Sequence, residues 1–372
     1  MLMRTVLFSV FLGSIQAFSR PVVPFLVRQN VDTRSSLLAS SNKDHDHAES
    51  AVFDPITSNT AFSSYQSKHA ESIADPSAFW EKEAGRLTWF QDPPKHHPAL
   101  HGSFTSGDVK FFPGGKLNMC YNAIDRHALA NGGKGGEEIA MIWEGDEPTD
   151  TKQFTYNEML ERVSQIANAL KDQGVKKGDV ITIYMPMIPE LPMTMLAAAR
   201  IGAVHSVVFA GFSADALGAR ISAAKSNFVI TADIGLRGTK QIPLKKIVDD
   251  AITKLDCDEL VKSCMVYERF YDKEAEDAPY DMKDRDVRMN PLVDLQRPYC
   301  VPEVMDAEDE LFILYTSGST GMPKGLVSRN RSSTSVLQHI ISNMHLISCL
   351  CCKGSYNGWI CLVRCIHHSN YI

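Results

Sequence analysis

Val180-Ile181-Thr182-Ile183-Tyr184-Met185 is a run of mainly apolar and β-branched residues, as is typical of a strand buried on both faces of a sheet. A helical pattern comes before it. Thr155 and Glu158 have the three-residue spacing of a capping box, apolar residues recur at helical intervals from 159 to 170, and Gly174 can terminate the helix. The chain therefore predicts a capped helix followed by a buried strand.

The same alternation continues after residue 185. Helical patterns extend to Arg200 and over about 214–224, and short apolar runs at 205–209 and 228–231 follow them. Strands that alternate with helices predict an α/β fold, in which helices cover both faces of a parallel sheet. In open sheets of this kind ligands bind beyond the carboxyl ends of the strands, so the site is expected there.

A later apolar run, Leu311-Phe312-Ile313-Leu314-Tyr315, has the character of a buried parallel strand and leads into a loop of glycine and hydroxyl residues. The glycines let backbone N–H groups approach a ligand closely, and Lys324 adds a positive charge, so the loop is expected to bind phosphates. Gly325 stands where a P-loop NTPase has Ser or Thr, which disfavours that family. A Ser/Gly-rich surface turn is the alternative. The expected phosphate ligands are Thr316, Ser317, Gly318, Ser319, Thr320, Gly321, Lys324 and Gly325.

Short motifs rich in aromatic, asparagine, glycine and acidic residues accompany this loop. They are Phe79-Trp80 with Trp89, Phe112 to Asn118, Asn122 to His127, Arg297-Pro298-Tyr299-Cys300 and Asp306-Ala307-Glu308-Asp309. Together with Leu311 to Gly325 they resemble the acetyl-CoA synthetase family of the adenylate-forming (AMP-binding) superfamily, from about Tyr65 to Val327. The resemblance implies the large N-terminal domain of such a synthetase, with parallel sheets and covering helices.

The resemblance also implies an activity, the ATP-dependent ligation of acetate to CoA through acetyl-AMP. Its substrates and cofactors are acetate, ATP, Mg²⁺ and CoA, with propionate or another short acid as the alternative substrate. Ser319 favours acetate, since propionate enzymes often have Thr there. The family's adenine, ribose and acyl contacts and its C-terminal lysine belong to segments expected after Gly325, so no catalytic residue is predicted. We therefore expect a truncated, inactive fragment of such an enzyme, with a non-catalytic binding fragment or a gene-model artefact as the further alternative.

Two turns are implied by the resemblance to bind the CoA nucleotide. From spacing alone, Phe209 is a core residue and Arg237 a solvated charge, whereas the family stacks the first on adenine and pairs the second with phosphate. The family more often has glycine at Ala210 and at Thr239. Lys245, on the helix expected next, is taken with Lys246 as a surface residue. The implied CoA ligands are Phe209, Gly211, Arg237, Gly238, Thr239 and Lys240.

Composition divides the chain into unlike segments. The formal charge of −6 at pH 7 gives no reason to expect a nucleic-acid partner, and the sequence does not indicate an oligomeric state. The expected segments are a signal peptide at 1–17, a transit peptide and linker at 18–60, a synthetase N-terminal cap at 61–124, a partial AMP-binding domain at 125–325 and a non-homologous tail at 326–372.

The first segments have the composition of a targeting sequence. A basic start at 1–4 precedes an apolar stretch at 5–17, which is too short to span a bilayer, so no membrane span is expected in the mature chain. Residues 18–41 are rich in arginine and hydroxyl groups, and Asp32 is their one acid. With Phe18 after the expected cleavage site, this resembles the two-part presequence of algal plastid proteins. Mitochondrial or secretory targeting is the alternative.

The tail at 326–372 contains no Asp or Glu, although the sequence has 44 of them, and it holds five of the nine cysteines. These cysteines lack the paired spacing of a zinc site, so no metal ligand is predicted. We interpret the tail as translated intron, because Val327-Ser328 is what a 5′ splice donor encodes in frame, and the genomic sequence beyond Val327 decides this. A secreted segment with disulfides among the tail cysteines is the alternative.

The targeting interpretation predicts where a fusion protein will accumulate. Residues 1–60 joined to a fluorescent protein should enter the plastid of a diatom, because the apolar segment directs entry to the secretory route and the arginine-rich segment follows it. Deletion of residues 18–41 should retain the fusion outside the plastid. Fluorescence of the intact fusion in mitochondria or the medium would contradict the interpretation.

Overall fold

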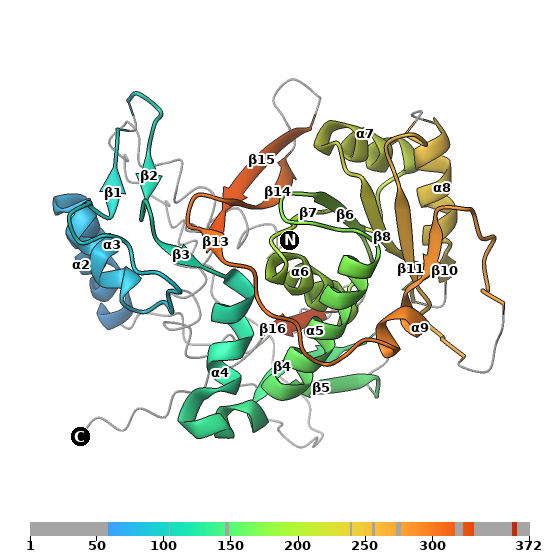
Figure 1. Ribbon diagram of the computed structural model, residues 1–372, viewed down its shortest axis with the longest axis horizontal. Coiled ribbons are helices and arrows are strands. Elements are labelled where there is room, and N and C mark those ends of the chain that lie inside the picture. Colours follow the sequence, from blue (N-terminus) through green and yellow to red (C-terminus); the bar gives the residue numbers. More distant parts are fainter. Residues whose placement is uncertain are drawn as a thin grey trace, which may run out of the picture. The chain divides into compact units, whose positions relative to one another are not determined.

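The computed structural model describes residues 59–103, 105–145, 149–238, 240–254, 257–272, 277–316, 323–330 and 359–362, with side chains described between 65 and 330. A seven-stranded sheet forms its centre, in the order β12-β11-β8-β6-β7-β14-β15, and every neighbouring pair is parallel except β14 with β15 (Figure 1). The strands are β6 (Val180–Tyr184), β7 (Val204–Val207), β8 (Phe228–Ala232), β11 (Ser263–Tyr267), β12 (Asp286–Arg288), β14 (Glu310–Thr316) and β15 (Lys324–Arg329).

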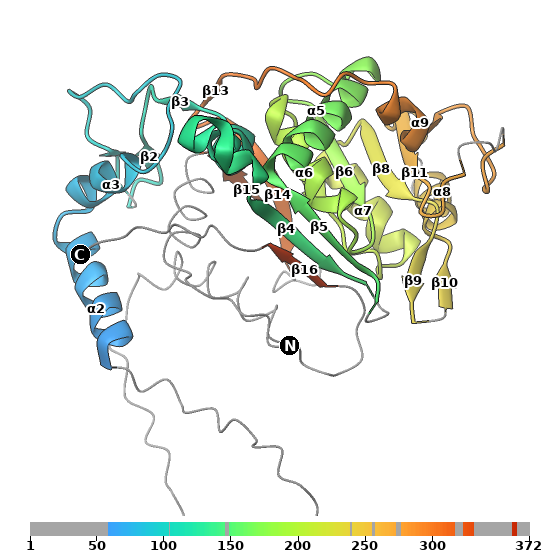
Figure 2. The ribbon, with the colours of Figure 1, turned by 90° about the horizontal axis from the view of Figure 1, so that it is seen from below.

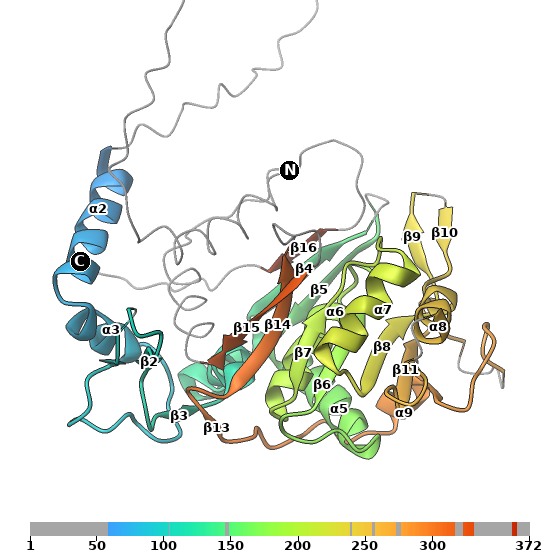
Figure 3. The same ribbon diagram turned by 90° about the horizontal axis from the view of Figure 1, so that it is seen from above.

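Helices cover both faces of this sheet, and each face has its own apolar core. On one face, α5 (Tyr156–Asp172) and α6 (Glu190–Arg200) pack against each other and against Ile181 and Ile183 of β6. On the other face, α7 (Ala214–Ala224) packs beside α8 (Leu244–Lys254), and their cluster includes Tyr184 of β6 (Figure 3). Successive strand residues point to opposite faces, so a strand covered on both sides is mainly apolar along its length.

The predicted helix before β6 is confirmed with its cap. Thr155 N donates to Glu158 Oε2 at 2.7 Å, and Glu158 N donates to Thr155 Oγ1 at 3.2 Å, which is the reciprocal pair of a capping box. The predicted helix at 214–224 and the strand near 228–231 are also confirmed. The strand predicted at 205–209 spans Val204–Val207 instead, so Phe209 lies beyond its end.

The strand before the glycine loop differs in part from the prediction. β14 is parallel to β7, as expected, but only its Leu311 is fully buried, and its other neighbour β15 is antiparallel. β15 is the last strand in the described sheet, and it exposes Val327. Within the described residues, none of the helices is both long and apolar enough to cross a bilayer.

Smaller elements surround the main sheet. A three-stranded antiparallel sheet has the order β16-β4-β5, and further two-stranded pairs are β1 with β2, β3 with β13, and β9 with β10 (Figure 2). Their bounds, with those of the remaining helices, are α2 (Asn59–Ala74), α3 (Pro76–Ala84), β1 (Leu100–His101), β2 (Lys110–Phe111), β3 (Lys116–Leu117), a π-helical turn (Tyr121–Asp125), α4 (Arg126–Ala128), a 3₁₀ segment (Ala130–Glu137), β4 (Ile139–Glu144), β5 (Thr151–Thr155), β9 (Gly235–Arg237), β10 (Lys240–Ile242), α9 (Met289–Asp294), β13 (Met305–Asp306) and β16 (Trp359–Leu362).

The segment before the π-helical turn has a small aromatic core of its own. Phe112, 1% exposed, meets Trp89 edge-to-face with 5.4 Å between ring centroids, and Trp89 Nε1 donates to Ala84 O at 3.0 Å. A Cβ on Gly115 would lie 2.7 Å from the Trp89 ring, so only glycine lets the chain turn against that ring. The aromatic and glycine motifs of this region therefore serve packing.

A buried ion pair joins this N-terminal segment to α6. Arg200 is fully buried, and its guanidinium donates to both carboxylate oxygens of Asp125 at 2.8 and 2.9 Å. Its Nε donates to Cys300 O at 2.6 Å, and Nη1 lies 3.4 Å from Cys120 Sγ. Burial alone would lower the pKa of Arg200, but the hydrogen bonds to Asp125 outweigh it and raise that pKa.

Two asparagines complete the junction. The Asn118 side-chain amide donates to Arg200 O at 3.2 Å and to Glu303 O at 2.9 Å, and the Asn122 amide donates to Thr88 O at 2.9 Å. These amides bond to backbone carbonyls of segments that are distant in sequence. Residues 118–125 are therefore the point where segments distant in sequence meet.

The Arg200–Asp125 pair predicts a large effect on stability. In Asp125→Ala the guanidinium stays buried without its carboxylate, which should lower the free energy of unfolding by about 3–5 kcal/mol. Denaturant titration followed by tryptophan fluorescence measures it. Asp294→Ala is the matched control, because it breaks the partly exposed Arg162–Asp294 pair (3.0 Å) and should cost less than about 1 kcal/mol. Equal losses in the two variants would refute the expectation.

Candidate functional site

The two ends of the glycine loop meet at the carboxyl end of β14. Thr316 is the Cα partner of Lys324, and Tyr315 is the partner of Gly325, so the β14–β15 pairing closes the loop at its base. The predicted phosphate ligands Thr316, Lys324 and Gly325 are thereby brought together, and Lys324 is exposed. The other predicted ligands, Ser317, Gly318, Ser319, Thr320 and Gly321, lie outside the described residues.

The adjacent strand β7 leads into a second predicted site, which also lies at the carboxyl ends of the strands. β7 pairs with β14 so that His205 and Ser206 are level with Phe312 and Ile313. Continuing that register by three residues sets Thr316 level with Phe209. The phosphate loop and the turn at 209–212 therefore start side by side on neighbouring strands.

The turn at 209–212 presents an aromatic ring to solvent. Phe212 N donates to Phe209 O at 3.0 Å, which closes the turn, and Phe209 is 62% exposed. A Cβ on Gly211 would lie 2.4 Å from the Phe209 ring, so glycine is what allows the ring to lie over this backbone. The spacing-based interpretation of Phe209 as a core residue is wrong, because β7 ends two residues earlier. An exposed ring at this edge is available to stack on a planar base.

Tyr184 anchors this turn from below, and sequence reasoning did not single it out. Its hydroxyl lies 2.8 Å from Phe212 O and 3.1 Å from Ala210 O, where it can donate to either carbonyl. Burial raises the pKa of Tyr184 to about 12, so the hydroxyl stays protonated as a donor near neutral pH. The available sequence signal was a tyrosine at the end of an otherwise apolar strand, since a buried phenol needs a polar partner.

The third predicted site is the hairpin of β9 and β10, which follows β8. Arg237 and Lys240 are Cα partners and both are exposed, Gly238 has φ +59°, and Thr239 lies outside the described residues. In the sheet, β8 is separated from β7 by β6 alone. All three predicted sites therefore lie beyond the carboxyl ends of the strands of one sheet. Figure 3 shows the hairpin extending beyond the start of α8.

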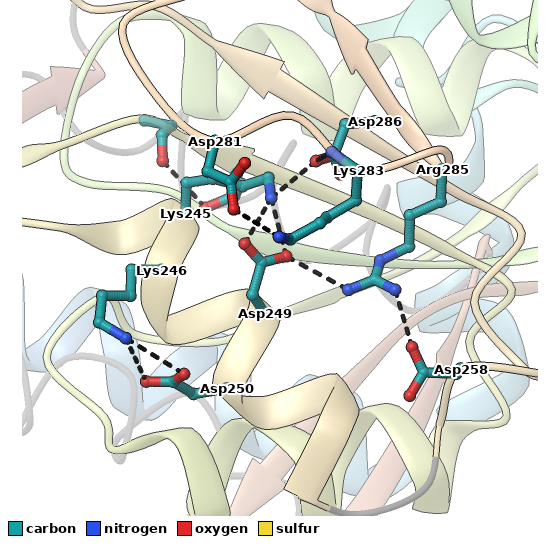
Figure 4. A network of polar contacts seen from close by, with 11 residues as sticks. Lys245, Lys246, Asp249, Asp250, Asp258, Asp281, Lys283, Arg285 and Asp286 are labelled. Atoms are coloured by element: carbon teal, nitrogen blue, oxygen red, sulfur yellow. Dashed lines mark hydrogen bonds and ion pairs between the residues drawn. The ribbon is translucent and has the colours of Figure 1, made fainter.

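The helix after this hairpin begins with a buried lysine, which corrects the expectation that Lys245 lies at the surface. Lys245 Nζ lies 2.7 Å from a carboxylate oxygen of both Asp249 and Asp286, and Asp286 is itself buried (Figure 4). Burial alone would lower the pKa of Lys245, but the hydrogen bonds to these two carboxylates raise it. Lys246, one residue on, is exposed as expected and faces Asp250.

This network holds the base of the hairpin. Arg285 extends it, with Nη2 3.2 Å from Asp249 and Nη1 2.8 Å from Asp258. The backbone N–H of Lys245 donates to Asp233 O at 3.2 Å, and Asp233 directly follows β8, ahead of the hairpin. The charged network is thus structural, and it fixes where Arg237 and Lys240 leave the sheet.

The opposite edge of the sheet has a polar hollow of about 430 Å³. Asp179, Phe228 and Ser263 line it at the amino ends of β6, β8 and β11, together with Lys176 and Lys262. It lies away from the carboxyl ends of the strands, where open parallel sheets bind ligands, so we assign it no part in the site.

In the part of the chain that the structure describes, no three His, Cys, Asp or Glu residues are grouped to hold a metal ion.

Comparison with known sequences identifies two matching families. The profile of the AMP-binding enzyme family matches residues 129–356, and that of the acetyl-coenzyme A synthetase N-terminus matches residues 65–123. Two curated relatives named acetyl-coenzyme A synthetase are those of Desulfatibacillum aliphaticivorans, 47% identical over 264 residues, and Syntrophobacter fumaroxidans, 48% identical over 265 residues. Each match covers 71% of this chain and 38% of the relative, so the chain spans about two-fifths of the length of these relatives.

A solved structure shares the fold. The acetoacetyl-CoA synthetase of Streptomyces lividans superposes with a TM-score of 0.62 at 22% identity, over 74% of this chain and 39% of that one. At this identity the likeness shows the fold alone. It confirms the predicted α/β architecture of a synthetase large domain.

The Tyr184 contact predicts a local effect on the turn at 209–212. Tyr184→Phe should lower the free energy of unfolding by about 1 kcal/mol and speed amide exchange at Phe212, because the turn loses its buried donor. Tyr267→Phe is the control, since it removes one hydrogen bond to Glu190 (2.9 Å) at another strand end. Hydrogen exchange with mass spectrometry separates them, and equal exchange at 209–212 in both variants would contradict the anchoring role.

Proposed function

The chain belongs to the AMP-binding enzyme family, and from this we propose that its residues bind Mg-ATP and CoA for the ligation of acetate to CoA through acetyl-AMP. The match of residues 65–123 to the acetyl-coenzyme A synthetase N-terminus supports acetate as the acid, as do the names of the relatives. Because the chain spans about two-fifths of those relatives, the whole reaction is proposed for the protein to which these residues belong.

The chemistry assigns this chain a binding role. The carboxylate of acetate is itself the nucleophile at the α-phosphate of ATP, pyrophosphate leaves, and the CoA thiolate then displaces AMP from acetyl-AMP. Negative charge on the departing phosphates must be met by preorganised donors. The Thr316 hydroxyl and the Lys324 ammonium would supply two of them, and we propose no nucleophile or general base among the residues of this chain.

The observation that carries the proposal is that the base of the predicted phosphate loop and the turn at 209–212 follow neighbouring strands. Thr316 and Lys324 meet at the base of the phosphate loop, and the turn with the exposed Phe209 ring follows β7, the next strand of the sheet. Arg237 and Lys240 stand at the same edge, where a guanidinium and an ammonium can pair with CoA phosphates. An ATP site and a CoA site at one edge are what ligation requires.

We also propose the plastid as the compartment of this activity. The support is the composition of residues 1–41, an apolar segment followed by an arginine-rich, acid-poor one. A secretory or mitochondrial location is the alternative.

Nucleotide titrations of the full chain test the proposal. Lys324→Ala should weaken Mg-ATP binding about 10-fold or more, because it removes a charge-assisted contact worth roughly 1.5–3 kcal/mol, and should leave CoA binding within about twofold. Lys240→Ala should do the reverse. Lys246→Ala, which removes an exposed lysine paired with Asp250, should change neither dissociation constant. Calorimetry that finds no binding of either nucleotide to the wild-type chain would refute the proposal.

A further inference from the structure

Arg220, on α7, lies beside the turn at 209–212. Its guanidinium carbon is 4.6 Å from the centroid of the Phe212 ring and 5.6 Å from that of the Tyr315 ring. Its Nη1 donates to Ala216 O at 2.6 Å, one helical turn earlier, which fixes the direction of the side chain. Among the residues that the structure describes, Arg220 pairs with no carboxylate, and burial lowers its pKa. Its charge is therefore stabilised by two aromatic rings and one carbonyl.

Phe212 is held at two points, one on its backbone and one on its side chain. Its carbonyl oxygen lies 2.8 Å from the Tyr184 hydroxyl, which anchors the turn to β6. Its ring lies against the Arg220 guanidinium, at a residue that is 39% exposed. The backbone contact sets the position of the turn, and the guanidinium sets the direction of the ring. Arg220 and Tyr184 thus have separate effects on Phe212.

The Phe212 ring in turn orients the Phe209 ring. The two rings meet edge-to-face, with 5.9 Å between their centroids and 79° between their planes. The backbone of Gly211 also limits the Phe209 ring, since a Cβ there would lie 2.4 Å from it. Phe209 is 62% exposed, so these neighbours leave much of the ring open to a ligand. A row of contacts therefore leads from Arg220 through Phe212 to Phe209.

We propose that Arg220 is a positioning residue, which acts through Phe212 to orient the Phe209 ring for stacking on the adenine of CoA. The identity of this ligand rests on the proposed function. A ring that is already held in its stacking direction loses less side-chain freedom when the ligand binds, and such preorganisation raises affinity without a new contact. The guanidinium lies against Phe212 while it donates to Ala216 O, which an apolar side chain cannot do.

The first test is calorimetric titration of the full chain with CoA. Arg220→Met should weaken CoA binding about fivefold, because the ligand must then order the Phe209 ring itself. Phe212→Leu keeps the charge of Arg220 and removes the intervening ring, so it should give a similar loss, and it serves alone if Arg220→Met folds poorly. Arg162→Met, a change at a partly exposed arginine of α5, should leave CoA affinity within about twofold of wild type. Wild-type affinity in Phe212→Leu would overturn the inference.

A double-mutant cycle separates positioning from direct binding. Phe209→Leu removes the flat ring, and in that background Arg220→Met should change CoA affinity by less than about twofold, because there is no ring left to orient. If Arg220 bound a phosphate of CoA directly, its substitution would weaken binding about as much without the Phe209 ring as with it. Independent losses of this kind would overturn the inference.

The last test needs no ligand. In the chain labelled with 4-fluorophenylalanine, the fluorine resonance of Phe209 is identified by its loss in Phe209→Leu. Arg220→Met should move this resonance toward that of a freely rotating ring, because the edge-to-face contact with Phe212 is no longer held, and Arg162→Met should not move it. An unchanged resonance in Arg220→Met overturns the inference and leaves the proposed function standing. If the resonance moves but the wild-type chain binds no CoA, the result supports orientation of the ring by Arg220 and refutes the proposed function instead.

Discussion

The Arg200–Asp125 ion pair is the constraint on which the rest of the fold depends. A fully buried guanidinium is costly unless its donors find partners, and here the partners come from two distant parts of the chain: the carboxylate of Asp125 and the sulfur of Cys120 from one, and the carbonyl of Cys300 from the other. Arg200 ends α6, and β7 begins four residues later. The ion pair therefore fixes where β7 starts, and through β7 the turn that carries Phe209.

Lys245 does the same on the other face of the sheet. It lies at the start of α8, where the helix dipole disfavours a cation, and its two carboxylate partners compensate for that position and for burial. Arg200, by contrast, lies at a helix C-terminus, where the dipole favours it. On both faces, then, a buried cation fixes the position of a helix against the sheet. Ion pairs of this kind add geometric definition that an apolar contact would not supply.

Sequence reasoning succeeded where the signal is local and failed where it depends on distant partners. The capping box of α5 and the apolar run of β6 are encoded in adjacent residues, so they could be predicted. The burial of Lys245 depends on Asp286, 41 positions later, and Asp249 on the same helix does not by itself distinguish Lys245 from the exposed Lys246–Asp250 pair. Likewise, the end of β7 before Phe209 follows from pairing with neighbouring strands. The Asn118 to Asp125 motif supported the family resemblance, but only the structure gives its physical reason.

The spacing of adjacent strands also explains why so few side chains suffice to organise the base of the glycine loop and the turn at 209–212. Adjacent strands lie about 4.8 Å apart, a spacing fixed by their hydrogen bonds, so the origins of the loop and of the Phe209 turn cannot separate. What remains adjustable is the path of each turn beyond its strand. Tyr184 controls one path from the sheet below, and the Tyr315 ring against Gly325 controls the base of the other. Arg220 on α7 contacts the ring of Phe212 in the turn and the ring of Tyr315 at the end of β14, because the sheet has already placed these two segments close together.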